Sequence, residues 1–212
     1  MSIRLIITHP GGAHKDDFLA CSLMVSVHGV PIVRRDPSEQ ELDDPSVCII
    51  DVGGRHEPEN NNFDHHQFPR DHKPTCALSL ILQHLGMYED AQMFCYWLEP
   101  AEWFDCRLPQ KTAEWLGVPC AFVGKLTSPI DISMLRRFAK ITPDSELHAG
   151  DPIYELMCYI GGDLLEYLKS VRSKLDSISA HVERWEVTSG GECFDVLFLP
   201  RTESAMDDAS GS

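Results

Sequence analysis

Short apolar runs recur early in the chain and are separated by polar, turn-forming segments. Apolar runs at residues 3–8, 30–34 and 47–51 predict three short buried strands, and the pattern at residues 16–28 predicts a helix between the first two. The polar segment 35–46 is bounded by prolines, which predicts a loop or a short surface helix. Buried strands that alternate with helices are typical of an α/β fold with a parallel sheet.

The rest of the chain has mostly helical periodicity. We expect helices at residues 76–86 and 89–105, with Pro100 bending or dividing the second one. Residues 152–185 are also helical in pattern, but the Gly161-Gly162 pair could divide them into two helices.

This pattern predicts three parts. The first is a domain at residues 1–130, with a parallel sheet and helices on both faces. The second is a helical extension at residues 131–199, which ends in a strand at 193–199. The third is a polar tail at residues 200–212, which we expect to be disordered.

Composition and charge narrow the possible functions of the 212-residue chain. Its formal net charge of −15 argues against a broad basic surface for nucleic acid, although bound metal ions can reverse the field locally. No apolar run approaches the ~20 residues that a membrane span requires. The first residues do not resemble a secretory signal or a basic organelle leader, and the eight scattered cysteines suit reduced thiols. We therefore expect a cytoplasmic protein.

Histidines and aspartates gather in three segments that follow predicted strands. Residues 8–17 come directly after the first strand, and Asp51 comes directly after the third. The segment 63–67 follows Asp51 after a loop rich in glycine and asparagine, so it can fold back toward the same place. Ligands of open parallel sheets bind beyond the carboxyl ends of the strands, so these segments predict a site there.

The residue types in these segments are those of a divalent-metal site. Imidazole together with carboxylate suits Mn²⁺, Zn²⁺, Fe²⁺ or Co²⁺ better than Mg²⁺ or Ca²⁺. Seven candidate ligands are too many for one tetrahedral ion, but they suit two ions about 3.5–4 Å apart that share a carboxylate. Asp51 is the natural bridge, because a residue at a strand end is held rigidly. The candidates are His9, His14, Asp16, Asp51, Asp64, His65 and His66.

Simpler interpretations exist for several of these side chains. Asp16 or Asp17 could cap the predicted helix, and Asp51 could stabilise a turn before Gly53. Four cationic residues lie in or next to the motif loops and could bind phosphate oxygens, although each could equally serve solubility. They are Lys15, Arg55, Arg70 and Lys73. The roles of the neighbouring His56 and His72 stay open.

The motifs resemble those of a known family. Residues 64–66 are similar to the signature Asp-His-His triplet of the DHH phosphoesterase superfamily. The first motif reads H-x4-H-x-D here (His9, His14, Asp16), where that superfamily has H-x3-D-x-D. Together with "DVGG" from Asp51 and "DHHQ" from Asp64, it resembles the MYG-one (melanocyte proliferating gene protein) family, a DHH-like branch of metal-dependent hydrolases. The likeness is close over residues 5–86 and loose over residues 87–199.

The resemblance implies two metal sites that share one carboxylate. The first would consist of His9, His14 and Asp51. The second would consist of Asp16, Asp51 and His65, and Asp105 would complete it. It further implies that His66 contacts the scissile phosphate and that Asp64 orients a neighbouring histidine.

In that family the chemistry is hydrolysis of phosphodiesters or phosphomonoesters, and the eukaryotic members resemble 3′–5′ exoribonucleases. We therefore expect two divalent ions, with Mn²⁺ first, that activate a water between them. The substrate would be a small nucleotide or a short single-stranded RNA or DNA. Family members are usually longer, with a further C-terminal domain, so nuclease and nucleotide phosphatase both stay open.

Two other functions fit the same residues. The chain could be a non-catalytic binding or regulatory module that keeps the fold, or a single-metal hydrolase of another ester or an amide. Metal stoichiometry and the activity of an Asp51→Asn variant distinguish these hypotheses. Oligomers are possible, and no membrane partner is expected.

Overall fold

The computed structural model describes residues 2–200, which fall into two compact units. The first unit extends to Leu165, and the second begins at Glu166, so the boundary lies within helix α9, Pro152–His181. The domain boundary expected at residue 130 lies inside the first unit.

A six-stranded sheet forms the centre of the first unit, in the order β4-β5-β3-β1-β2-β6. Its strands are β1 (Leu5–Thr8), β2 (Ile32–Arg34), β3 (Val47–Ile50), β4 (His56–Glu57), β5 (Asn62–Phe63) and β6 (Glu146–Leu147). The four inner strands are parallel, whereas β4 and β6 pair antiparallel at the two edges. The predicted α/β fold with a parallel sheet is confirmed, and in this sheet the sequence pattern missed the two-residue strands β4, β5 and β6.

Eight further helices surround the sheet. They are α1 (Lys15–His28), α2 (Glu39–Leu42), α3 (Ala77–His84), α4 (Tyr88–Phe94), α5 (Leu98–Cys106), α6 (Pro109–Leu116), α7 (Cys120–Val123) and α8 (Pro129–Ala139). Two 3₁₀ turns, Pro58–Asn60 and Gly124–Leu126, complete the unit. The elements between residues 106 and 147 were not predicted; they contain few buried residues.

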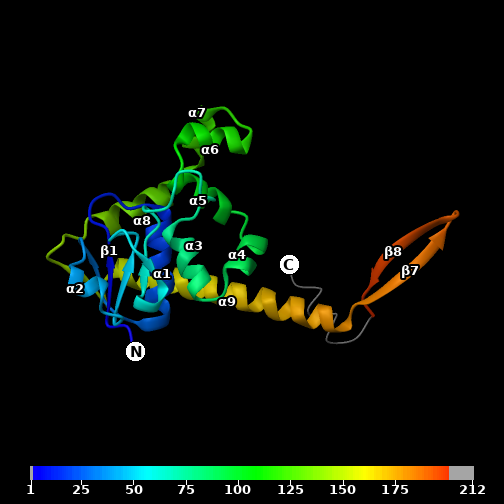
Figure 1. Cartoon of the computed structure of the whole chain (residues 1–212), viewed down its shortest axis with the longest axis horizontal. Helices are drawn as coiled ribbons and strands as arrows, with labels where there is room; N and C mark the ends of the chain where they lie inside the picture. The colour runs from blue at the N-terminus through cyan, green and yellow to red at the C-terminus, as the bar shows by residue number, and fades with distance from the viewer. Residues whose placement is uncertain (1, 201–212) are drawn as a thin grey trace. The chain divides into compact units, whose positions relative to one another are not determined.

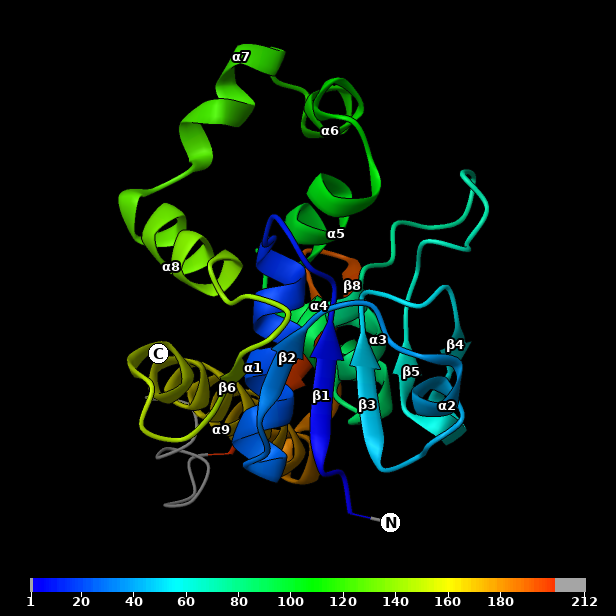
Figure 2. The same ribbon diagram turned by 90° about the vertical axis from the view of Figure 1, so that its left-hand side faces the viewer.

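The two faces of the sheet are covered unequally. Alternate residues of β1 and β3, among them Ile7 and Ile49, pack with Leu42 of the short helix α2. The opposite face is covered by α1 and α3, which lie behind the sheet in Figure 2. Most residues of these two helices are buried. This arrangement leaves the carboxyl ends of β1 and β3 pointing toward α5 (Figure 2).

Two helix predictions differ from the structure. The break in the predicted helix 89–105 falls between α4 and α5, and Pro100 lies in the first turn of α5. A proline is tolerated there because the first amide groups of a helix have no partner within it. Residues 152–181 form one helix, α9, rather than two. Gly161 serves close packing, since a Cβ atom there would lie 2.0 Å from the carbonyl oxygen of Ser22 in α1.

The second unit contains the end of α9 and a hairpin of β7 (Glu183–Ser189) and β8 (Glu192–Phe198). The predicted last strand is therefore present, but it pairs with β7 and not with the main sheet (Figure 1). Gly190 and Gly191 have φ angles of 61° and 86°, the left-handed conformation that two-residue hairpin turns need. Apart from Pro200, the predicted tail lies outside the described residues.

Among residues 2–200, no helix combines the length and the apolar character needed to cross a bilayer.

Candidate metal centre

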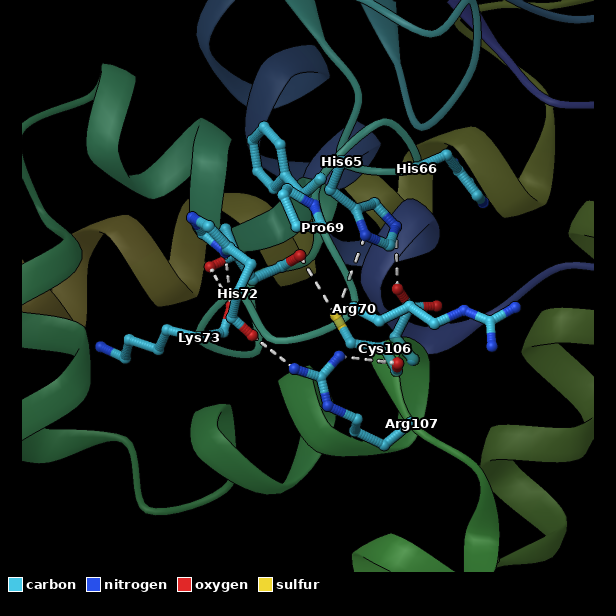
Figure 3. A pocket seen from close by; sticks show the side chains of 11 residues that line it. His65, His66, Pro69, Arg70, His72, Lys73, Cys106 and Arg107 are labelled. Carbon is cyan, nitrogen blue, oxygen red and sulfur yellow. Dashed lines mark hydrogen bonds and ion pairs between the residues drawn. The ribbon is translucent and has the colours of Figure 1, made fainter.

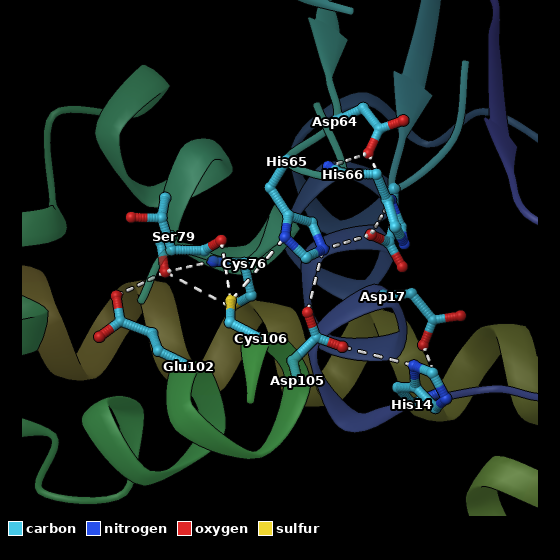
Figure 4. Close-up of polar contacts among 12 residues, drawn as sticks. His14, Asp17, Asp64, His65, His66, Cys76, Ser79, Glu102, Asp105 and Cys106 are labelled. Atoms are coloured by element: carbon cyan, nitrogen blue, oxygen red, sulfur yellow. Dashed lines mark hydrogen bonds and ion pairs between the residues drawn. The ribbon is translucent and has the colours of Figure 1, made fainter. Parts of the chain in front are cut away.

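Four parts of the fold bring histidines and aspartates together. The loop after β1 carries His9 and His14, and the turn after β3 carries Asp51. Since β5 runs parallel to β3, the triplet that begins at Asp64 also follows a strand end. The fourth contribution is Asp105, near the end of α5 (Figure 4). The predicted convergence at the strand ends is thus what the structure shows.

Distances within this cluster are short. His65 Nε2 lies 3.0 Å from Asp51 Oδ1 and 2.9 Å from Asp105 Oδ2. His9 Nε2 lies 3.5 Å from Asp51 Oδ2, and His14 Nδ1 lies 3.4 Å from Asp105 Oδ1. Asp105 therefore reaches two histidines, and Asp51 reaches three, since His66 Nδ1 lies 3.7 Å from Asp51 Oδ1.

Four overlapping groups of these side chains have ligand atoms close enough to hold a metal ion, all within 4.8 Å of one another. They are His9-His14-Asp51, Asp51-His65-His66, His65-Asp105-Cys106 and His14-Asp16-Asp105. The first group is the set that the family resemblance implies. Asp16 is grouped with His14 and Asp105, not with Asp51 and His65 as the resemblance implies, and Cys106 is an addition that sequence reasoning missed.

Asp16 is the least compensated charge in the cluster. It is 1% exposed, and neither of its carboxylate oxygens has a hydrogen-bond partner among the described residues. Burial raises its pKa well above the usual value, and the nearby carboxylates of Asp105 and Asp51 raise it further. A buried carboxylate without a partner destabilises the folded protein, and a bound cation would remove this free-energy cost.

The ring nitrogens and carboxylates around Asp16 fit a divalent ion. His65 Nε2, Asp51 Oδ1 and Asp105 Oδ2 are likewise buried and form no hydrogen bond of normal geometry within the described chain. Although burial opposes a positive charge on His65, the carboxylates of Asp105 and Asp51 outweigh it and raise the pKa of that imidazole. A site that draws a proton so strongly also draws a metal ion, which competes for the same nitrogen.

The backbone at Asp51 is unusual. Its φ angle is 60°, in the left-handed region that residues other than glycine seldom adopt. Such a conformation costs on the order of 1–3 kcal/mol and is found mainly where function or packing requires it. Here it turns the chain sharply after β3, where the Asp51 amide donates to the Phe63 carbonyl oxygen at 3.0 Å.

The remaining histidine of the triplet has a partner of its own. His66 Nδ1 lies 2.7 Å from Asp64 Oδ1, and that carboxylate is 2% exposed whereas the His66 side chain is 64% exposed. Asp64 also accepts from the amides of His66 and Gly54. The hydrogen bond to Asp64 raises the pKa of His66 and fixes its ring at the surface of the cluster.

A buried ion pair holds the first motif loop in place. Arg34, at the end of β2, is fully buried and donates to the carbonyl oxygens of His9 and Gly12 and to Asp17. Asp17 accepts from the His14 amide at the start of α1, so the capping interpretation is right for Asp17. Sequence reasoning missed Arg34; a lone arginine that ends an apolar strand was the available signal.

A cationic pocket of about 220 Å³ opens beside the cluster (Figure 3). His65, His66 and Asp105 form one wall. Two of the predicted substrate residues, Arg70 and Lys73, line it, together with Arg107, which was not predicted.

The other two predicted substrate residues lie elsewhere. Arg55 forms ion pairs with Glu39 and Asp43 at 2.5 and 2.8 Å and lines none of the described pockets. Lys15 lies 3.4 Å from Asp131 of α8 and lines a different pocket, on the Asp16 side of the cluster.

Comparison with known proteins points to one family. Residues 5–86 match the family model MYG1_exonuc, described as "Uncharacterised protein family (UPF0160)". The MYG1 exonuclease of Rattus norvegicus is 41% identical over 64 residues, which are 28% of this chain and 16% of that protein. The MYG1 protein of Chlamydia trachomatis serovar D is 43% identical over 70 residues, 30% of this chain and 22% of that protein.

The longest of these matches extends beyond the motifs. A MYG1 protein of Chlamydia pneumoniae is 33% identical over 109 residues, which are 49% of this chain and 31% of that protein. The matched part of this chain thus spans less than a third of each of these relatives. No solved structure matches the chain. The family model and these relatives agree on the segment that carries the histidine motifs, so residues 5–86 of this chain are similar to the MYG1 family.

Proposed function

We propose that the chain is a metal-dependent phosphoesterase that hydrolyses phosphate esters of nucleotides, with 3′–5′ removal of nucleotides from a short single strand as its activity. The observation that carries the proposal is the buried, unpartnered carboxylate of Asp16 within a cluster of imidazoles and carboxylates. Such a cluster is stable only when positive charge balances it.

Two divalent ions are the cofactor that we propose, with Mn²⁺ first because imidazole and carboxylate ligands suit it. Asp51 belongs to two of the four ligand groups, on opposite carboxylate oxygens toward His9 and His65, so it can serve both ions. When bound, the ions would lower the pKa of a water molecule toward neutrality and neutralise charge on the phosphate.

His66 and its buried partner Asp64 supply a proton donor at the edge of the site. Asp64 holds one ring nitrogen and raises the pKa of the imidazole above its usual value, which favours the protonated ring. The other ring nitrogen is then available to donate to a phosphate oxygen or to the leaving oxygen.

The cationic pocket supports a phosphorylated substrate. Arg70, Lys73 and Arg107 place three positive side chains next to the cluster in a protein of net charge −15. Guanidinium groups bind phosphate through paired hydrogen bonds, so this wall can hold a substrate phosphate. Of the three relatives above, the rat protein is called an exonuclease and the two chlamydial proteins are called MYG1 proteins.

The test combines metal analysis with an assay. Purified protein would be analysed for bound metal and then tested for hydrolysis of bis-p-nitrophenyl phosphate with and without added Mn²⁺. We expect two ions per chain and Mn²⁺-dependent turnover, both lost in Asp51→Asn and kept in the surface control Asp43→Asn. One ion per chain would favour a single-metal hydrolase, and full turnover by Asp51→Asn would contradict the proposal.

A further inference from the structure

A second pocket, unlike the first, borders the same cluster. It has a volume of about 510 Å³, within the range of small-molecule sites. Its walls are mainly apolar and come from α5, α8 and the turn after α7; they include Trp97, Phe104, Val123 and Leu135. At one end the walls give way to Asp16 and Asp105 of the metal cluster.

The apolar pocket and the cationic pocket share the wall formed by Asp105. A phosphate held at the cluster would therefore have positive side chains on one side and aromatic side chains on the other. This asymmetry matches the chemistry of a nucleotide, in which charged phosphates alternate with flat, largely apolar bases. It does not match a simple phosphomonoester, which offers nothing to an apolar wall.

The aromatic side chains of the pocket are open to solvent. Trp97 is 40% exposed and Phe104 is 38% exposed, although both are large apolar residues close to the catalytic cluster. Proteins that bind single-stranded nucleic acids use exposed aromatic rings next to charged side chains, and the bases stack on these rings. Lys15, which also lines this pocket, adds a cation between the cluster and α8.

We propose that the apolar pocket between α5 and α8 binds the base of the nucleotide whose phosphate is hydrolysed at the metal cluster. This inference rests on the proposed phosphoesterase function and adds a binding site for the base of the substrate. Trp97 and Phe104 are then the residues that determine specificity, and their role is binding rather than proton transfer.

The test compares a thymidine dinucleotide with two copies that carry an abasic tetrahydrofuran unit at one position or the other. We expect one of the two abasic dinucleotides, the one that lacks the base bound in the pocket, to have a KM about tenfold above that of the intact dinucleotide. This is the size of effect typical of one stacked base. In Trp97→Ala and Phe104→Ala this ratio should fall to about one, and Trp97→Phe should largely restore it. Phe122→Ala is the matched control, because Phe122 is 51% exposed on α7 but does not line the pocket.

Failure of this inference is distinguishable from failure of the proposed function. If the unaltered protein cleaves all three dinucleotides with the same KM, it is a phosphoesterase that does not bind the base, and the inference is wrong. If it cleaves none of them, calorimetric titration with AMP decides. AMP binding that weakens about tenfold in Trp97→Ala and not in Phe122→Ala supports the base site, and absence of AMP binding overturns it.

Discussion

Folding buries the carboxylate of Asp16 in surroundings that destabilise its negative charge. Its carboxylate is fully buried beside Asp51 and Asp105, and in metal-free protein nothing among the described residues offsets it by a hydrogen bond. The proposed metal site would explain why this unfavourable burial is kept, since functional residues often lower the stability of a protein.

Replacing Asp16 by asparagine should consequently stabilise the metal-free protein. The change removes repulsion between buried carboxylates and the cost of burying the Asp16 charge, so we expect a higher free energy of unfolding. Urea unfolding at neutral pH in the presence of a chelator measures it. The surface change Asp43→Asn should have almost no effect, and a less stable Asp16→Asn protein would contradict the explanation.

Residues that belong to sequence motifs were predictable, and residues that support them were not. His9, His14, Asp51 and the triplet at 64–66 follow strand ends that apolar runs already marked. Arg34 and Arg107 owe their importance to neighbours distant in sequence, Asp17 and His65 among them, and such contacts leave no local pattern.

At the scale of elements, helix packing explains a glycine that looked like a break. Gly161 lies in α9 where this helix meets the backbone of α1, whereas Gly162 has open space around its Cα atom. The two glycines have the same helical propensity, so a difference between alanine substitutions at these positions reports the effect of packing alone.

Gly161→Ala should destabilise the protein, because the new methyl group would overlap with the Ser22 backbone and force the helices apart. Overpacking of this kind costs about 1–3 kcal/mol. Gly162→Ala should instead stabilise by about 0.5–1 kcal/mol through helix propensity alone. Thermal and urea unfolding of the pair measure both changes, and equal effects of the two substitutions would show that the close contact is unimportant.

The capping of α2 makes a contribution that depends on pH. The guanidinium of Arg35 and the Ser38 cap lower the pKa of Glu41 from 4.5 to about 2. The folded state therefore stabilises the ionised form of Glu41 more than the unfolded chain does. The contribution is complete above pH 4.5, and it is lost as the pH falls toward 2.

Glu41→Gln should thus lower stability at neutral pH and flatten its dependence on pH in that acidic range. The pair is partly exposed, so we expect an effect below about 1 kcal/mol. Urea unfolding across this pH range would show it. Glu59→Gln, an exposed substitution in the first 3₁₀ turn, should leave the pH dependence as it is; an equal change there would point to general charge effects.

At the scale of the whole molecule, metal binding and folding should be coupled. The ligand groups come from three strand ends and α5, so the unfolded chain cannot present them together. A ligand that binds only the folded state at 100 times its Kd adds about 2.7 kcal/mol to the free energy of unfolding. We expect a gain of this size with Mn²⁺, measured against a chelator. Asp43→Asn should retain the gain and Asp51→Asn should lose it; no gain in the unaltered protein would contradict a preformed site.

The sequence predicted the helices and strands of the first part of the chain better than those after residue 106. Apolar runs separated by turn residues identified β1, β2, β3 and α1, because each is buried almost completely. The helices α6 to α8 were not predicted, since most of their residues are exposed or only partly buried. They nevertheless complete the apolar pocket, so the part of the site least visible in the sequence is the part that would select the substrate.

The position of Asp105 on α5 also has a consequence for synthesis of the protein. Ribosomes produce the histidines and Asp51 first, and the last carboxylate of the cluster follows only with α5. A nascent chain that stops before this helix has His65 without one of its two close carboxylates. If the cluster binds metal as we propose, the complete centre can therefore form only after α5 has left the ribosomal tunnel, and a shorter nascent chain would lack one of its ligands.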